Sequence, residues 1–222
     1  DAQESRGLGD VYKRQVYYHK ILMTNIILDQ LYTMNGTDME RQDLAGEAYF
    51  MRAFSYFMLA NLYGKPYHPA TANEDLCVPL NKEIGLSDKM MKRATNAAVY
   101  AQMEEDINKA IQCFKAIGGE KTIFRPNLPS AYLLASRIAL FQEKYDVTIL
   151  YCDSVFKVAT QPLYKLQEKK DHYFFSLANK EILLSYGLTS LETHMKEDFR
   201  YTGNLVVSDD LLALYSEDDL RL

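Results

Sequence analysis

The 222-residue chain lacks several features that would place it in a specialised class of protein. It has no tryptophan and only three cysteines, too few for a disulfide scaffold. Its longest uncharged helical stretch, residues 53–64, is far shorter than the ~20 residues that a membrane-spanning helix requires. It has no basic block and a net charge of −5, so we expect no nucleic-acid partner. With 48% hydrophobic and 25% charged residues, the composition is that of a globular domain and excludes intrinsic disorder.

Motifs that would indicate catalysis or metal binding are also missing. The chain contains no Gly-x-Ser-x-Gly, no Gly-x-x-x-x-Gly-Lys and no His-Glu-x-x-His. Ser154 and Lys157 match Ser-x-x-Lys without its companion motifs, so we interpret them as helix surface. The polar cluster around His194 favours a solvated loop, and the acidic run 104–106 favours a solvated helix face. We therefore expect no catalytic residue, no metal site, no cofactor and no enzymatic activity.

The two ends of the chain suggest a fragment. The first residue is not Met, and residues 1–15 include Gly7 and Gly9 without an apolar period, which fits poorly in front of a helix. We expect residues 1–15 to be a foreign leader that is not part of the fold. The last residues continue a helical pattern without a Gly or Pro stop. Residues 16–222 are therefore predicted to be one helical domain that is truncated at both ends.

Apolar periodicity predicts a series of helices. The first spans residues 16–34, with an extension back into residues 1–15 as the alternative. Its buried stripe is expected at Val16, Met23, Ile27, Leu31 and Met34. Thr37 and Glu40 form a capping-box pattern that opens a second helix, which ends at residue 63. This second helix is apolar on more than one face, which is typical of a helix that packs on both sides.

A long irregular stretch separates the second helix from the third. Residues 64–94 have no sustained apolar period, and loops of such length in compact domains are usually functional or mobile. Further helices are predicted over 96–117, 129–141 and 146–158, with Asp146 as the N-cap of the last. The last two resemble one tetratricopeptide hairpin. Because a single hairpin cannot bury its apolar face alone, we predict an all-α fold of layered tetratricopeptide-like hairpins, with long irregular loops and little or no β.

Charged and tyrosine side chains are the remaining candidates for a special role. Glu47 and Arg52 lie in the apolar second helix, where a buried charge requires a partner, and we expect a structural pairing. Most of the 17 tyrosines fall in predicted helices and are expected in the core. A tyrosine in an irregular segment can instead stack on a sugar ring and bind its hydroxyls. Tyr67, Tyr186 and Tyr201 are such candidates.

The second helix also carries a family resemblance. It contains, in order, Gly46-Glu47-Ala48-Tyr49-Phe50-Met51-Arg52-Ala53, Tyr56-Phe57-Met58-Leu59 and Leu62-Tyr63-Gly64. Together these strings resemble the hallmark helix of SusD/RagB-type outer-membrane nutrient-binding lipoproteins. Later segments resemble the family in the same order, among them Val78-Pro79-Leu80, Arg93-Ala94-Thr95, Arg137-Ile138-Ala139-Leu140-Phe141 and Asp219-Leu220-Arg221. The resemblance covers residues 16–222. Three departures are local: Ala98 stands in place of a capping Glu, Glu143 in place of a turn Gly, and Val207 in place of a Pro.

The resemblance implies a surface-facing lipoprotein of the Bacteroidetes outer membrane that binds glycans or related nutrients. It would deliver them to a partner SusC-like TonB-dependent transporter and catalyse no reaction. Its contact with the membrane would be only through an N-terminal lipid that is absent from this fragment. Binding residues vary within the family, so none transfers by motif, and our candidates for ligand binding are Tyr67, His68 and Tyr201. The alternative function is a helical-repeat scaffold that binds a protein or peptide partner.

Overall fold

A computed structural model of the chain describes residues 2–85, 91–119, 122–159, 181–186 and 213–214. The chain divides into two compact units, one of residues 1–122 and 126–159, the other of residues 123–125 and 160–222. The helices of the described part belong to the first unit and are α1 (Ala2–Gln30), α2 (Asp38–Tyr63), α3 (Asn96–Ile117), α4 (Leu128–Phe141) and α5 (Tyr145–Val158). The described residues contain no strand and one isolated antiparallel bridge, between Leu76 and Thr95. The predicted all-α class is confirmed.

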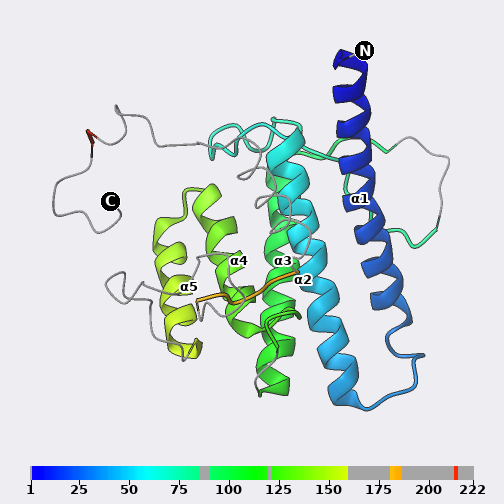
Figure 1. Cartoon of the computed structure of the whole chain (residues 1–222), viewed down its shortest axis with the longest axis vertical. Helices are drawn as coiled ribbons and strands as arrows, with labels where there is room; N and C mark the ends of the chain where they lie inside the picture. The colour runs from blue at the N-terminus through cyan, green and yellow to red at the C-terminus, as the bar shows by residue number, and fades with distance from the viewer. Residues whose placement is uncertain (1, 86–90, 120–121, 160–180, 187–212, 215–222) are drawn as a thin grey trace, which may run out of the picture. The chain divides into compact units, whose positions relative to one another are not determined.

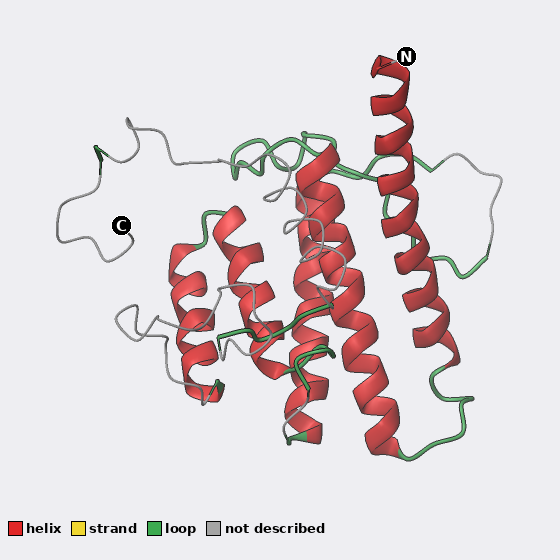
Figure 2. Cartoon of the chain, in the orientation of Figure 1, coloured by secondary structure: helices red, strands yellow, loops and turns green. Residues whose placement is uncertain are grey.

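The helices of the first unit form a layered array. Each one packs against the next along the chain, from α1 on α2 to α4 on α5, and successive helices run in opposite directions (Figures 1 and 2). The layered hairpins predicted from the sequence are therefore present. The bounds of α3 agree with the predicted range, and α2, α4 and α5 end at the predicted residues.

α1 differs from its predicted form. It begins at Ala2, so that residues 2–15 are helical, and it ends at Gln30. The assignment of residues 1–15 to a foreign leader stays a prediction. The predicted buried stripe is wrong in part, because Val16 and Met23 are 52% and 39% exposed. The buried side chains of this region are Ile21, Thr24, Asn25 and Leu31. Two of these four are polar, which is why an apolar period placed the buried face incorrectly.

Local sequence signals set the helix ends. Glu40 N–H donates to Thr37 Oγ1 at 3.2 Å and Thr37 N–H donates to Glu40 Oε2 at 2.8 Å, which is the predicted capping box. Thr95 caps α3 by accepting a hydrogen bond from Ala98 N–H at 3.3 Å, and an alanine at this position has no side chain to return the bond. Gly118 follows α3 at φ +65°, a conformation that glycine adopts without strain.

α2 lies between α1 and α3 and is buried on both sides, as its sequence predicts. Its fully buried side chains include Ala53, Tyr56 and Leu59. Gly46 allows the close approach of α3, because a Cβ atom at this position would lie 2.6 Å from Cε1 of Phe114. The Phe57 ring meets Phe141 at the end of α4 edge-on, with the ring centroids 5.1 Å apart. Residues 46–64 therefore supply much of the interior of the array.

The turn between α4 and α5 contains a strained residue. Glu143 has φ +62°, and it is the one non-glycine residue with a positive φ in the described part of the chain. The resemblance noted in the sequence implies a turn Gly at this position. The predicted N-cap of α5, Asp146, is wrong: Lys144 precedes the helix, and Asp146 lies in the first turn, where its charge suits the positive end of the helix dipole.

Replacing Glu143 by glycine should stabilise the protein, because glycine adopts a positive φ without the steric penalty of a Cβ atom. We expect Glu143→Gly to raise the free energy of unfolding in urea by about 1 kcal/mol. Glu143→Ala is the matched control, since it also removes the charge but keeps a Cβ atom. Equal stability of the two variants would contradict this explanation.

Candidate functional site

A buried ion pair connects α2 and α3. Arg52 donates from Nε to Asp106 Oδ2 at 2.9 Å and from Nη2 to Asp106 Oδ1 at 2.6 Å. The Asp106 side chain is fully buried, and that of Arg52 is 12% exposed. Two parallel charge-assisted bonds fix the orientation of the pair as well as its distance. The pairing predicted for Arg52 is confirmed, whereas the prediction of a solvated face over 104–106 is wrong at Asp106.

The same arginine extends the network to α1 and to residues 64–95, which we call the excursion. Arg52 Nη1 donates to Asn25 Oδ1 at 2.9 Å. Asn25 Nδ2 in turn donates to two carbonyl oxygens of the excursion, those of Asn81 at 3.0 Å and Glu83 at 3.2 Å. Asn25 is only 3% exposed, and a buried amide is stable only when its polar atoms are bonded. Three helices and the excursion therefore share one buried network.

One buried and one half-buried tyrosine hold the same part of the excursion. Tyr56 OH on α2 donates to Asn81 O at 3.0 Å and accepts a hydrogen bond from Asn81 N–H at 2.9 Å. Tyr18 OH on α1 donates to Pro79 O at 2.8 Å. Burial raises the pKa of Tyr18 to about 12 and also raises the pKa of Tyr56. Both phenols therefore keep the proton that these bonds require at neutral pH.

The end of the excursion is joined to a segment nearer its middle. Cys77 N–H donates to Ala94 O at 2.7 Å, and Ala94 N–H donates to Val78 O at 3.1 Å. Arg93 Nε adds a bond to Cys77 O at 2.5 Å. These bonds bring together two of the segments that carry the family resemblance. Segments that were recognised separately in the sequence are therefore in contact in the fold.

The predicted ligand-binding residues Tyr67 and His68 lie at the start of the excursion. Tyr67 is half-buried, and its ring centroid is 4.7 Å from that of Tyr100 on α3. His68 is exposed, and its Nδ1 accepts a hydrogen bond from the N–H two residues further on at 3.3 Å. Tyr186 is 57% exposed and belongs to the second unit, and Tyr201 lies outside the described residues. A role in ligand binding stays a prediction for each of them.

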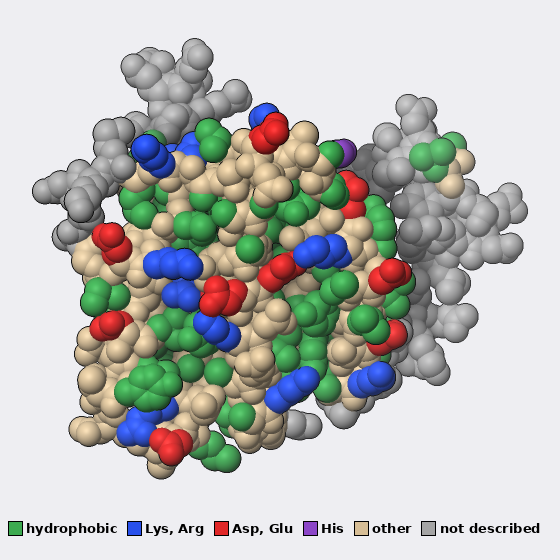
Figure 3. All heavy atoms as spheres, turned by 180° about the vertical axis from the view of Figure 1, so that it is seen from behind, with side chains coloured by type: hydrophobic (Ala, Val, Ile, Leu, Met, Phe, Trp, Pro, Cys, Tyr) green, Lys and Arg blue, Asp and Glu red, His purple; other side chains and the backbone are tan. Residues whose placement is uncertain are grey.

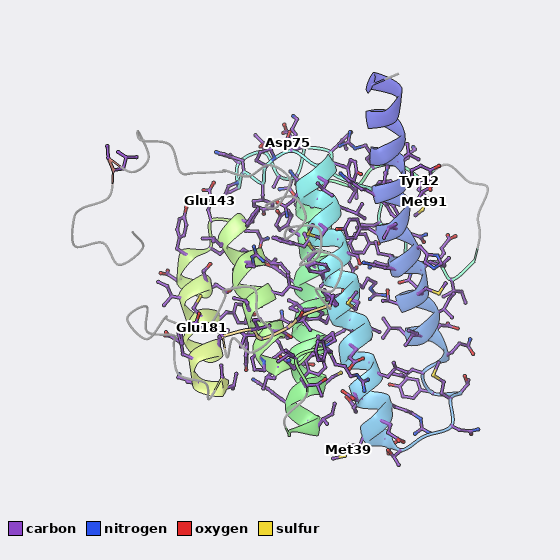
Figure 4. The ribbon with its side chains drawn as sticks, viewed as in Figure 1. Tyr12, Met39, Asp75, Met91, Glu143 and Glu181 are labelled. Carbon is purple, nitrogen blue, oxygen red and sulfur yellow. The ribbon has the colours of Figure 1, made fainter. Side chains whose placement is uncertain are left out.

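A hollow of about 250 Å³, which we call the α1 hollow, lies between α1 and the far end of the excursion. α1 lines it with Tyr18, His19 and Leu22, and the excursion lines it with Asn81, Glu83, Gly85 and Met91. Met91 is labelled beside α1 in Figure 4. Tyr67 and His68 do not line this hollow. Sequence analysis missed it because its walls come from segments far apart in the chain.

The surface of the described residues carries both signs of charge. Acidic and basic side chains lie intermixed over the face shown in Figure 3. In the part of the chain that the structure describes, no three His, Cys, Asp or Glu side chains gather as a metal site requires. No helix in that part is both long and apolar enough to cross a membrane.

Comparison with protein families identifies the class of this helical scaffold. A family model described as "Starch-binding associating with outer membrane" matches residues 9–140, more than half of the chain. The chain therefore belongs to the SusD-like family, in agreement with the resemblance found in α2. The comparison with curated proteins gives no match.

Solved structures show the same fold. A SusD-like carbohydrate binding protein from Bacteroides vulgatus has a TM-score of 0.66 and 21% identity, covering 78% of this chain and 36% of its own. A SusD superfamily protein from Bacteroides thetaiotaomicron has a TM-score of 0.64 and 25% identity, covering 70% of this chain and 34% of its own. A laminarin binding SusD-like protein has a TM-score of 0.54 and 24% identity, and the match covers 65% of this chain and 29% of that protein. The chain thus spans between 29% and 36% of the length of these relatives.

Removing one partner of the buried ion pair should lower the free energy of unfolding more than removing both partners. Asp106→Leu leaves the Arg52 guanidinium buried without its carboxylate, and we expect it to lower the free energy of unfolding by about 3 kcal/mol or more. The double variant Arg52→Met/Asp106→Leu also removes the uncompensated charge, so it should lose less than the sum of the two single variants. Urea unfolding of the wild type and the three variants measures this coupling. Strictly additive losses would contradict a direct pairing.

Proposed function

We propose that this chain is the helical scaffold of a cell-surface protein that binds glycans or related nutrients and catalyses no reaction on them. Membership of a family described as starch-binding and associated with the outer membrane supports this function. The relative that is named as laminarin binding supports a polysaccharide as the kind of ligand. We further propose that the bound glycan is delivered to a partner TonB-dependent transporter, and that a lipid on the N-terminus of the whole protein holds it at the membrane.

The observation that carries this proposal is the way in which the excursion is held. Side chains from α1 and α2 bond to the backbone of Pro79, Asn81 and Glu83, although these residues belong to an irregular segment. A loop fixed by a rigid scaffold is the usual arrangement of a binding site. Because binding residues that are already in place lose less conformational freedom when a ligand arrives, a held loop suits a protein whose task is binding.

A peptide-binding scaffold is the second candidate, and the outer surface of α5 favours it. Ile149, Leu150 and Phe156 are 59%, 65% and 63% exposed. Exposed apolar side chains on one helix are typical of a contact with another polypeptide. The solved relatives are about twice as long as this chain, so another part of the same protein is a second source of such a polypeptide.

Native gel electrophoresis in the presence of soluble polysaccharides tests the proposed function. We expect laminarin or starch to retard the 222-residue chain relative to an unrelated protein of similar charge. Tyr67→Ala should weaken this retardation about fivefold, because it removes an aromatic face, while Tyr67→Phe should keep it. A chain that no polysaccharide retards but that binds an immobilised peptide library would contradict the proposal in favour of the peptide scaffold.

A further inference from the structure

We propose that the α1 hollow is a subsite for one neutral pyranose ring of the bound glycan, with Glu83 selecting against acidic sugars. This inference rests on the proposed glycan-binding function and adds to it a place and a class of sugar. It concerns residues that the sequence did not suggest, because neither Tyr67 nor His68 lines the hollow.

The size of the hollow fits a single ring. Its volume of about 250 Å³ lies below the roughly 300–1,000 Å³ of pockets that enclose a drug-sized ligand. It is therefore too small for an oligosaccharide, but one ring of a longer glycan can occupy it while the rest of the chain extends into solvent. Such a site recognises one sugar unit and places no limit on the length of the glycan.

The lining of the hollow offers both of the contacts that a sugar ring makes. Leu22 and Met91 provide apolar surface for the C–H face of the ring, and the Tyr18 ring provides an aromatic edge or face. His19, Asn81 and Glu83 provide polar groups for its hydroxyls. A few polar groups around an apolar floor are typical of a site that orients a small polar ligand.

The charge of the lining distinguishes among sugars. Glu83 is exposed, so its carboxylate can accept hydrogen bonds from two hydroxyls without first losing an internal ion pair. The same carboxylate repels a uronic acid or another anionic sugar. The hollow therefore favours a neutral sugar.

The excursion wall of the hollow is held in place before any ligand arrives. Asn25 bonds to the carbonyl oxygens of both Asn81 and Glu83, and Tyr18 bonds to that of Pro79. The Glu83 N–H also donates to Asn81 Oδ1 at 2.9 Å, which fixes the backbone next to the selecting carboxylate. Polar groups that are fixed in this way by rigid helices bind without a large loss of conformational freedom.

The test compares two hollow variants with two matched controls on the 222-residue chain. Leu22→Trp fills the hollow, and Leu133→Trp places the same bulk on the exposed surface of α4. Glu83→Gln removes the selecting charge, and Glu74→Gln removes an exposed charge elsewhere in the excursion. Each variant is measured by retardation with whichever polysaccharide retards the wild type. Saturation-transfer NMR is also carried out, with methyl glycosides of glucose, galactose, mannose and xylose and with methyl glucuronide.

We expect Leu22→Trp and Glu83→Gln to weaken polysaccharide binding about tenfold, as the loss of a hydrogen bond to a charged group does, while both controls bind like the wild type. Saturation transfer from the wild type should be stronger to the neutral glycosides than to the glucuronide, and Glu83→Gln should reduce this difference. Because Glu83 is exposed, its variant tests the inference even if Leu22→Trp does not fold. Hollow variants that are retarded like the wild type would overturn the subsite and leave the proposed function intact, whereas a wild type that no polysaccharide retards would overturn both.

Discussion

The structure depends on the buried pair of Arg52 and Asp106. A guanidinium in the interior of a helical array is tolerated only with a carboxylate beside it, and both bonds of this pair are made. The pair fixes the register of α2 against α3, and the remaining donor of Arg52 reaches Asn25 on α1. The side chain of Arg52 therefore bonds to both neighbouring helices, α1 and α3. Apolar contacts, such as that of Gly46 with Phe114, complete the packing between α2 and α3.

The network also explains how an irregular segment of this length keeps a defined place. Asn25 and Tyr56 both bond to the backbone of Asn81, so the middle of the excursion is attached to α1 and α2 at one point. The backbone hydrogen bond between Cys77 and Ala94 joins two parts of the excursion that lie on either side of this point. The helices provide rigidity and the excursion provides polar atoms at the surface, which is the division of roles that a binding protein requires. The proposed subsite lies where these two parts meet.

Features that depend on neighbouring residues were predictable from the sequence, and features that depend on distant ones were not. The capping box of Thr37 and the stop at Gly118 involve residues within one helical turn, so these two helix ends followed from local rules. Asp106 was assigned to a solvated face because its partner is 54 residues away. Asn25 was missed because a buried amide counts as polar in any apolar period. The α1 hollow has the same cause, since only the network places Asn81 and Glu83 beside α1.

Amide hydrogen exchange of the folded chain tests the central claim most directly. If the buried network holds the excursion to the helices, the N–H of Asn81, which donates to Tyr56, should be protected as strongly as amides in the middle of α2. The N–H groups of Cys77 and Ala94, which donate within the excursion, should be protected to the same degree. The same three amides should lose protection together in Asp106→Asn, because the network would open as a unit. Rapid exchange of these amides in the wild type, with α2 still protected, would show that the excursion is not held by the network and would contradict the account.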